Sequence, residues 1–530
     1  MSRRLILLLC LLCWNAAIAA PAPQPESAAD WAWDQISHHH IADFNLRCGK
    51  TLDPIKDTDA RWADPCRGVS ADDLAAMILR DDVPREGVRL VGVRVVGDLD
   101  LEDAEVKHPL WIQASRIDGS LNLRRAELDK LLLLDRTRVT GALVGDGLRA
   151  QEGILLRDHA DVKGEVLLAD ARIDDDLDLD GSTFEGDLVA ADLQADHIFM
   201  RGRADFKHAV NLYDARTTEN VELDDSNFEN GLNADRLQAG NDLLIKDAKF
   251  SGPLVLIAAQ IGDGLFLNGS DFISVNLSEA VIRSEFRLSE GSSVAKWHGG
   301  AALRPPALNL RNAEVGILQD SLAALPASVD LDNFSFVSLG GAGATTEEDP
   351  SDRTADEWLI WLEKNVYARK AFNPQPYANL SKFLAGVGRQ SDADTITFAS
   401  QQAERVQDWR RGDIWPALWL TALWLLCGYG VGAYSLFVLL WVAASVALGV
   451  VVLRLSPEAR RHHLIWCVFA CLERLLPVVT LYKGFSKFFS NRDGKNLCRW
   501  QVGFFCLYAL WGWGLSLILI AAISGITRVQ

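Results

Sequence analysis

The sequence lacks the short motifs that mark common catalytic sites. Its 530 residues contain no G-x-S-x-G nucleophile motif, no H-E-x-x-H metal motif and no phosphate-binding loop. A net basic charge is also lacking before residue 413, because acidic residues outnumber basic ones there. From Asp413 onward there are ten Lys and Arg against four Asp and Glu, so the net charge of −18 divides into +6 for this tail and −24 for the rest. Nucleic-acid binding requires clustered Lys and Arg, so the acidic part argues against a nucleic-acid partner.

Cysteine is equally scarce in this acidic part. After Cys10 and Cys13 it contains only Cys48 and Cys66, a pair that an oxidising compartment tends to join. We treat this pair as a candidate disulfide, which would close a loop of about 19 residues and contribute about 3 kcal/mol. The other five cysteines lie in or beside apolar segments near the C-terminal end, where burial as small apolar residues is expected.

The first residues have the layout of a secretory signal peptide. Arg3 and Arg4 precede an apolar run from Leu5 to Trp14, and Ala17-Ile18-Ala19 supplies a small-x-small cleavage site. Residues 1–19 are therefore predicted to be a signal peptide, with an uncleaved anchor as the alternative. An exported protein, with its large N-terminal region in the bacterial periplasm, is the expected consequence.

The dominant feature is an eleven-residue repeat between about Val88 and Phe336. Apolar or small side chains recur at steps of 2, 3, 2 and 4, which is neither the 3.6 of a helix nor the steady alternation of one strand. Short strands separated by corners fit this spacing. Representative blocks are Leu99, Leu101, Ala104 and Val106; Leu121, Leu123, Ala126 and Leu128; Leu177, Leu179, Ser182 and Phe184; and Leu243, Ile245, Ala248 and Phe250.

The spacing predicts a mainly β fold, a parallel β-helix with about 22 residues per coil, over residues 85–340. Four short sides form each coil, large apolar residues fill its interior, and the Ala, Ser or Thr slot lets the backbone turn close to the core. Val88 to Leu288 then gives about nine coils, and the crossover preference makes them right-handed. Gly97-Asp98, Asp118-Gly119 and Gly186-Asp187 mark turns where unusual dihedral angles are expected.

The units Leu101–Val106 and Leu123–Leu128, which read LEDAEV and LRRAEL, resemble the A(D/N)LXX units of the pentapeptide-repeat family. The resemblance covers about half the chain and implies a square right-handed β-helix. Steps of five and six alternate here, and Asn or Asp rarely follows the Ala. Cytoplasmic members of that family mimic DNA and act on topoisomerases, a role that does not suit an exported protein.

Two features interrupt the regular repeat. Asp174, Asp175, Asp176, Asp178 and Asp180 crowd one corner, where a calcium site competes with a solvated acidic surface. The glycine-rich nonapeptide of calcium-binding β-rolls is absent, which favours the solvated surface. Arg201 falls in an interior-type slot, so either this coil is distorted or the charge has a buried partner.

The repeat is flanked by helical regions. Residues 20–84 are predicted to be an N-terminal cap with helices at Trp31–Ile41 and Ser70–Leu79, the second with Ser70 as N-cap. The run His38-His39-His40 cannot face one metal ion from a helix, because consecutive residues there point about 100° apart. Residues 350–412 are predicted to hold a helix with a Thr354 and Glu357 capping box, followed by a hairpin of helices at 376–388 and 391–409.

Residues 413–530 are predicted to be a membrane domain. The apolar segments 435–453 and 501–523 are long enough to span a bilayer, and 415–430 and 464–481 are further apolar segments. Basic residues such as Arg460 and Lys487 place the intervening loops in the cytoplasm, which favours two spans over four. This arrangement resembles bacterial membrane proteins with a pentapeptide-like ectodomain and C-terminal transmembrane segments.

Glu473, Arg474 and Pro477 form the candidate functional element of the membrane domain. A charge inside the membrane or a segment broken by Pro can line a pathway. An interfacial helix whose charges face water is the simpler alternative.

These observations favour a binding or scaffolding protein of the cell envelope, anchored in the inner membrane and displaying a periplasmic β-helix. Its expected partners are envelope proteins or cell-wall components, together with the lipid bilayer. A transport or channel role with a regulatory solenoid is one alternative, and an envelope carbohydrate-active enzyme is another. No residue set in the sequence indicates a catalytic site, a metal or a cofactor, and the oligomeric state is left open.

Overall fold

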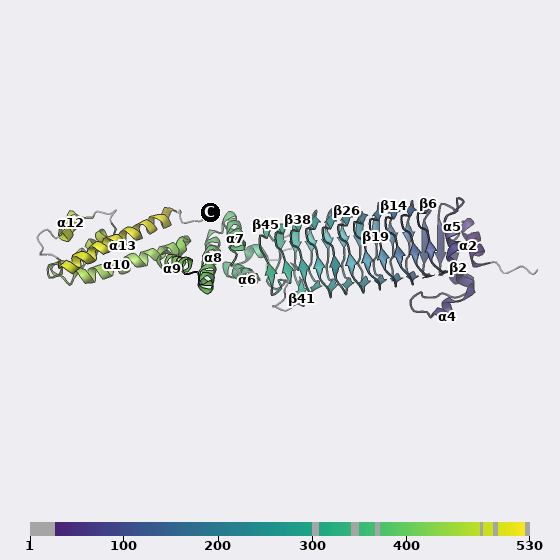
Figure 1. The fold of residues 1–530 in the computed structure, drawn as a ribbon, viewed down its shortest axis with the longest axis horizontal. Helices are drawn as coiled ribbons and strands as arrows, with labels where there is room; N and C mark the ends of the chain where they lie inside the picture. Colours follow the sequence, from purple (N-terminus) through teal and green to yellow (C-terminus); the bar gives the residue numbers. More distant parts are fainter. Residues whose placement is uncertain are drawn as a thin grey trace, which may run out of the picture. The chain divides into compact units, whose positions relative to one another are not determined.

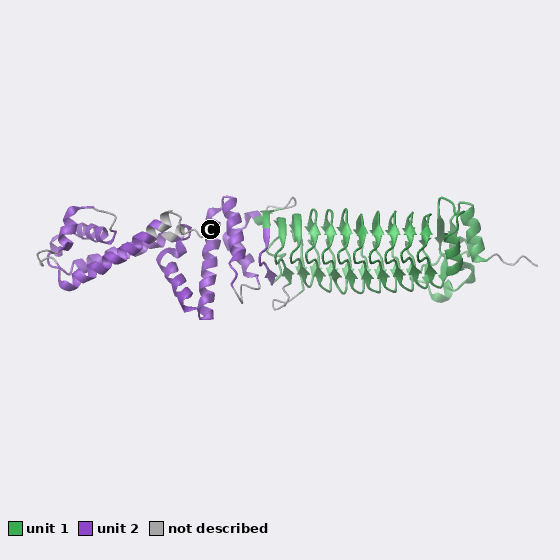
Figure 2. Ribbon diagram, turned by 45° about the horizontal axis from the view of Figure 1, so that its top comes forward, with its two compact units in different colours: residues 1–327, 336–350 green, residues 328–335, 351–530 purple. Residues whose placement is uncertain are grey.

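The computed structural model describes residues 27–298, 307–340, 349–365, 372–476, 481–490 and 497–524. The predicted signal peptide lies outside these residues. The chain divides into two compact units, one formed by residues 1–327 and 336–350 and the other by residues 328–335 and 351–530 (Figure 2). The first unit is built from strands, and the second is mainly helical.

The first unit is a parallel β-solenoid of about 12 turns with about 22 residues per turn. One turn consists of four short strands: β5 (Leu99–Asp100), β6 (Glu105–Val106), β7 (Leu110–Gln113) and β8 (Arg116–Asp118). Each strand pairs with its equivalent 22 residues later, so that Leu99 faces Leu121 and Glu105 faces Glu127. The repeated strands form the stacked ladders in Figure 1. The predicted coil length and parallel stacking are confirmed.

The prediction of about nine coils is too low, because the stack continues past both ends of the regular repeat. The predicted cap region contributes β1 (Ala42–Asp43) and β2 (Gly68–Ser70), which pair in parallel with β3 (Val88–Val91) and β4 (Arg94–Val96). Toward the other end, β42 (Leu308–Asn309) pairs with β37 (Val275–Asn276). Hydrogen bonding of the backbone carries the stack through segments whose side-chain spacing is irregular.

The interior is filled as the repeat predicts, and its fourth slot forms an aromatic stack. Adjacent ring centroids in this stack are 4.7 to 5.3 Å apart, and its members are Phe184, Phe206, Phe228, Phe250 and Phe272. Buried hydroxyl groups occupy some of the small slots. Ser182 donates to the carbonyl of Leu156 at 2.8 Å and accepts from the amide of Ala160 at 3.1 Å. Such residues satisfy backbone groups that would otherwise be buried without a partner.

The left-handed corner residues are not all where the turns were predicted. Gly97 does have a positive φ of 101°, but the recurring left-handed residue is the one before the small slot, such as Asp103 (56°), Asp170 (57°) and Asp192 (57°). Asp tolerates this conformation because its short side chain bonds locally. Gly186 has another role: a Cβ atom there would lie 2.4 Å from the carbonyl oxygen of Gly164, so the residue permits close stacking of turns.

The start of the solenoid is covered by short helices. They are α2 (Ala28–Ser37), α3 (Phe44–Arg47), α4 (Asp59–Trp62), the 3-10 helix η1 (Pro65–Arg67) and α5 (Ala71–Ile78). Ser70 caps α5 by accepting from the amide of Asp73 at 3.1 Å, as predicted. Helix α2 begins and ends earlier than the predicted 31–41, with Ser27 as its N-cap.

The second unit contains α6 (Ala355–Glu363), α7 (Gln375–Gly386), α8 (Gln390–Arg411), α9 (Ile414–Cys427), α10 (Phe437–Leu453), α11 (Leu464–Leu475), α12 (Lys483–Ser490) and α13 (Arg499–Ser524). The predicted capping box at Thr354 and Glu357 is present. Helices α7 and α8 form the predicted hairpin and pack against each other. Within this unit, Asn379 of α7 also donates to the carbonyl of Phe334 at 3.0 Å.

Helices α10, α11 and α13 pack around one apolar core, and Figure 1 shows α10 beside α13. The predicted spans 435–453 and 501–523 correspond to α10 and α13. Across the described ranges, no helix combines the length and the hydropathy that crossing a bilayer requires. Large apolar side chains nevertheless face outward in this unit, with Trp415 83% and Leu440 69% exposed. The prediction that all five C-terminal cysteines are buried is wrong for Cys498 and Cys506, which are exposed.

Candidate functional site

The solenoid carries two polar regions that could act on other molecules. The first is a column of charged residues on one side, and the second is a loop closed by a disulfide near the first turns. Both belong to the first unit.

The acidic corner predicted at residues 174–180 is divided among several partners. Asp176 lies 2.9 Å from Nδ1 of His197, Asp178 accepts from the amide of Asp180 at 3.0 Å, and Asp180 binds Arg201. No group of three or more His, Cys, Asp or Glu side chains could hold a metal ion in the described part of the chain. Asp176 and Asp180 are thus bound to side chains of the next turn.

Arg201 does not occupy the interior slot that the sequence pattern predicts. Met200 fills the interior there with no exposed surface, and the side chain of Arg201 is 34% exposed on the outside. The reason is a change of register: Ile154 pairs with Leu177 after 23 residues, whereas Leu177 pairs with Ile198 after 21. This local slip moves the arginine to the surface side of the strand.

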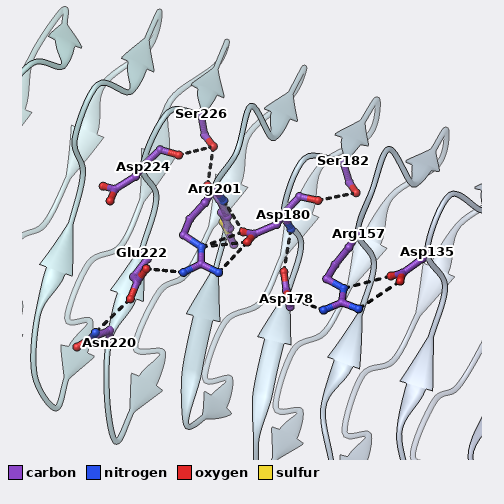
Figure 3. Close-up of polar contacts among 11 residues, drawn as sticks. Asp135, Arg157, Asp178, Asp180, Ser182, Arg201, Asn220, Glu222, Asp224 and Ser226 are labelled. Carbon is purple, nitrogen blue, oxygen red and sulfur yellow. Dashed lines mark hydrogen bonds and ion pairs between the residues drawn. The ribbon is translucent and has the colours of Figure 1, made fainter.

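Arg201 joins three successive turns (Figure 3). Its Nη2 donates to Asp180 on the preceding turn at 2.8 Å, and its Nη1 donates to Glu222 on the following turn at 2.7 Å. Burial lowers the pKa of the guanidinium, but the hydrogen bonds to the two carboxylates outweigh burial and raise it. The arginine is therefore a fixed cationic bridge along the solenoid.

This bridge is part of a longer column in which acidic and basic side chains alternate from turn to turn. We call it the charge column, and its members are Asp135, Arg157, Asp180, Arg201, Asp224 and Lys246. Arg157 donates to both oxygens of Asp135 at 3.2 Å, and Asp224 accepts from the amide of Lys246 at 2.7 Å. Figure 3 shows the arrangement from Asp135 to Asp224. Alternation places opposite charges next to one another on adjacent turns, which favours stacking of the turns.

Two carboxylates, Asp224 of the charge column and Asp178 beside it, are held in a partly desolvated environment. Burial raises the pKa of Asp178, and backbone hydrogen bonding and the charge of Arg157 only partly offset it. Burial likewise raises the pKa of Asp224. A ligand that brings hydrogen-bond donors to these oxygens would therefore be favoured by this surface.

A second outward column lies two residues before the charge column, on the strands that directly precede it. It is largely apolar, and its members are Trp111, Leu133, Leu155, Asp178, Phe199, Glu222, Leu244 and Phe266. The guanidinium of Arg201 lies 4.0 Å from the ring centroid of Phe199. The two columns together form a face that combines flat apolar groups with fixed charges, and such a face suits binding of an extended ligand or protein segment.

The disulfide-closed loop, residues 49–65, is the second polar region. Cys48 and Cys66 form a disulfide at its ends. Arg116 of β8 fixes the loop with all three guanidinium nitrogens, and its side chain is only 4% exposed. Its acceptors are the carbonyl of Pro54 (2.8 Å), the carboxylate of Asp59 (2.6 Å) and the carbonyl of Asp57 (2.7 Å).

Trp62 lies between two arginines at the end of this loop. The guanidinium carbons of Arg67 and Arg116 are each 5.2 Å from its ring, and its indole N–H donates to the carbonyl of Asp53 at 3.3 Å. The sequence reasoning did not single out Arg116 or Trp62. The signal was present as three arginines spaced by 22 residues, at positions 94, 116 and 138.

The loop borders two clefts on the surface of the solenoid. One of about 590 Å³ lies against residues 51–57 and includes Arg136, Asp158 and His159. The other, of about 510 Å³, is lined by Asp59, Trp62, Arg94, Arg116, Asp118, Arg138, Thr140 and Lys163. The second cleft is rich in cations, in contrast to the acidic chain that surrounds it.

The predicted membrane element is only partly described. Glu473, in α11, accepts from the amides of Leu481 and Tyr482 at 2.8 and 2.9 Å, so it contacts the backbone directly before α12. The guanidinium of Arg474 lies 5.8 Å from the ring of Phe489. Pro477 lies outside the described residues.

No protein family, curated protein or solved structure matches this chain. The class that the fold defines is a parallel β-solenoid joined to a helical unit. The functional conclusion therefore rests on the contacts and surfaces of the chain itself.

Proposed function

We propose that this protein is a binding or scaffolding protein that displays its β-solenoid from a membrane surface. The helical unit holds the chain at the bilayer, and the solenoid offers its two outward columns to envelope proteins or cell-wall components. Placement in the bacterial inner membrane, with the solenoid in the periplasm, follows from the leader-like first residues and is part of the same proposal.

The observation that carries the proposal is the opposite placement of apolar side chains in the two units. In the solenoid, leucine and phenylalanine fill the interior, as Phe228 does with no exposed surface. In the helical unit, large side chains face outward, including Leu507 at 69% and Leu510 at 68% exposed. Contiguous exposed apolar surface of this kind marks a membrane or a protein interface.

The surroundings of α10 and α13 give further support. A groove of about 400 Å³ is lined by apolar and aromatic side chains, among them Trp441, Leu448 and Trp511. Two polar side chains of the bundle are bonded to other helices: the hydroxyl of Tyr508 donates to the carbonyl of Ser445 at 3.2 Å, and the indole N–H of Trp511 donates to the hydroxyl of Ser445 at 3.1 Å. Hydrogen bonds between helices combined with apolar exteriors suit a lipid environment.

The pentapeptide-repeat relationship and right-handed winding belong to this proposal as well. Support comes from the recurring small slot and from the strong preference of parallel crossovers for one hand. A fold shared with that family does not imply a shared activity, because one architecture serves many functions.

Labelling of introduced cysteines in intact spheroplasts tests the topology. In a Cys498→Ser and Cys506→Ser background, Arg149→Cys on the solenoid is expected to react with an impermeant maleimide. Arg460→Cys and Lys487→Cys are expected to react only after the membrane is permeabilised. Release of the full chain by alkaline carbonate, or protection of Arg149→Cys, would overturn membrane display.

Site-specific photocrosslinking tests the binding face. A photoreactive residue at Leu155 or Phe199, in the outward apolar column, is expected to form adducts with envelope components. The matched position is Val255, which is also a partly buried outward residue but belongs to a different side of the coil. Equal adduct formation at Val255 would count against a dedicated face.

A further inference from the structure

Three arginines stand directly next to one another on adjacent parallel strands near the start of the solenoid. Arg94 of β4 pairs in register with Arg116 of β8, and Arg116 pairs with Arg138 of β12 (Arg138–Val139). Like charges placed opposite each other on neighbouring strands destabilise a sheet. Carboxylates of the chain offset part of this repulsion, since Asp118 pairs with Arg94, Asp59 with Arg116 and Asp161 with Arg138.

The middle arginine is committed to the loop. All three nitrogens of the Arg116 guanidinium are bonded to the disulfide-closed loop. This residue therefore positions the loop and Trp62 over the strands. The two outer arginines differ from it, since neither is bonded to the loop.

Arg94 and Arg138 keep donors for another group. Arg94 donates to Asp118 through Nε at 2.5 Å, so its two Nη groups point to the cleft without this acceptor. Arg138 approaches Asp161 through Nε at 3.3 Å. Lys163 lies 3.1 Å from the same carboxylate and donates to Glu185 at 2.5 Å, and its ammonium group has three donors in all. Their side chains are 27%, 22% and 25% exposed, in the order Arg94, Arg138 and Lys163, so each reaches the cleft.

The arginine cluster already stabilises the charged form of one carboxylate of the chain, that of Asp59. Hydrogen bonding from Arg116 lowers the pKa of Asp59, and the charges of Arg138 and Arg94 add to the effect. The side chain of Asp59 is otherwise 97% exposed at the edge of the cleft. The site therefore stabilises an anion that the loop itself supplies.

We propose that this cleft binds a tetrahedral oxyanion, the phosphate group of a small phosphate ester. Arg94, Arg138 and Lys163 donate to the oxyanion, and Arg116 and Trp62 hold the loop that closes one wall. Three cationic donors suit the three terminal oxygens of a phosphate better than the two of a carboxylate. The volume of about 510 Å³ leaves room for the organic part of such a ligand.

This proposal does not depend on attachment to a membrane, because every residue involved belongs to the solenoid unit. Failure of the membrane experiments would leave it untouched. Conversely, loss of phosphate binding would say nothing against the topology.

Calorimetric titration of the detergent-solubilised full chain with inorganic phosphate and with glycerol 3-phosphate tests the site. Arg94→Gln and Arg138→Gln are each expected to weaken binding by about tenfold or more, since each removes a charge-assisted hydrogen bond. The matched control is Arg149→Gln, an arginine of the solenoid that is 72% exposed and paired with Glu127. It is expected to leave binding unchanged.

Asp59→Asn gives a result that simple damage to the fold cannot imitate. The amide oxygen still accepts from Arg116, but the competing negative charge is gone, so phosphate is expected to bind about two- to fivefold more tightly. Absence of phosphate binding in the unaltered chain would overturn the proposal. Equal weakening by Arg94→Gln and Arg149→Gln would overturn it as well.

The source of the phosphate is distinguished by a second pair of probes. Tighter binding of glycerol 3-phosphate than of a short-chain phosphatidylglycerol supports a soluble ester, and the reverse order supports a lipid headgroup. Either order of affinity supports the oxyanion site. If neither probe binds, the proposal is contradicted.

Discussion

Arg201 and Asp180, on adjacent turns of the solenoid, are joined by both the side chain and the backbone of the arginine. Nε and Nη2 of Arg201 lie 3.0 and 2.8 Å from Oδ2 of Asp180, and the amide of Arg201 lies 2.8 Å from Oδ1. The carboxylate is thereby fixed in one orientation, and the free Nη1 continues the contact to Glu222. This relationship makes the charge column a structural element as well as a surface.

Arg201→Gln should destabilise the solenoid. The substitution leaves Asp180 and Glu222 without their common cation, and solvent screening limits the cost to about 1–2 kcal/mol. Denaturant unfolding of the full chain in detergent measures the change. Arg203→Gln is the matched control, because that arginine is 88% exposed and lies 3.9 Å from Asp225. Equal losses for the two variants would show that the bridge has no special role.

Asp224→Asn should stabilise the protein at neutral pH. Burial raises the folded-state pKa of Asp224 above its ordinary value of 3.8, so the stability linked to its protonated form is present below pH 3.8 and lost as pH rises through the folded pKa. The amide keeps the acceptor for the amide of Lys246 and removes the charge. A gain of up to about 1 kcal/mol at pH 7, absent near pH 3, is expected in thermal unfolding.

Asp103→Asn should show the opposite sign under the same conditions. Hydrogen bonds from Arg125 at 2.7 Å lower the pKa of Asp103, so its contribution is present above pH 3.8 and lost as pH falls through the folded pKa. Asn also tolerates the left-handed backbone of this position. Shifts of the same sign for the two variants would contradict the assignment of burial and pairing.

Removing the disulfide should loosen the start of the solenoid. Cys48→Ser with Cys66→Ser opens a loop of 18 residues in sequence separation and should cost roughly 3 kcal/mol through the unfolded state. Hydrogen exchange should rise in residues 49–65 and at β2, while the central turns stay protected. The matched pair Cys498→Ser with Cys506→Ser, both exposed, should change neither measurement.

The regular part of the fold was predictable because each position of the repeat has the same structural role in every coil. Leu99, Leu121 and Leu243 all point inward, and the spacing alone fixed the coil length. The slip at residues 174–201 was not predictable in the same way. A step of 23 residues followed by one of 21 keeps the backbone ladder intact. Backbone hydrogen bonding therefore continues through a segment where the side-chain spacing is interrupted.

The candidate sites were harder to predict than the coil. Asp178 and Asp180 were noticed because they are close in sequence, but their partners Arg157 and Arg201 are one turn away in each direction. Arg94, Arg116 and Arg138 were overlooked because surface positions in a repeat vary freely. Their significance depends on the disulfide-closed loop, whose path over the strands no sequence spacing specifies.

Gly186→Ala should be among the most damaging small substitutions in the solenoid. The added Cβ would lie 2.4 Å from the carbonyl oxygen of Gly164, a backbone atom that cannot move without separating two turns. A loss of about 2–4 kcal/mol is expected in denaturant unfolding, comparable to overpacking in a core. Gly202→Asn separates this steric effect from backbone strain. Gly202 has a φ of 62°, which Asn tolerates, and a Cβ there meets nothing closer than 3.9 Å, so its stability should change little. If the Asn variant were the more damaged of the two, conformational strain rather than the contact between turns would set the requirement for glycine.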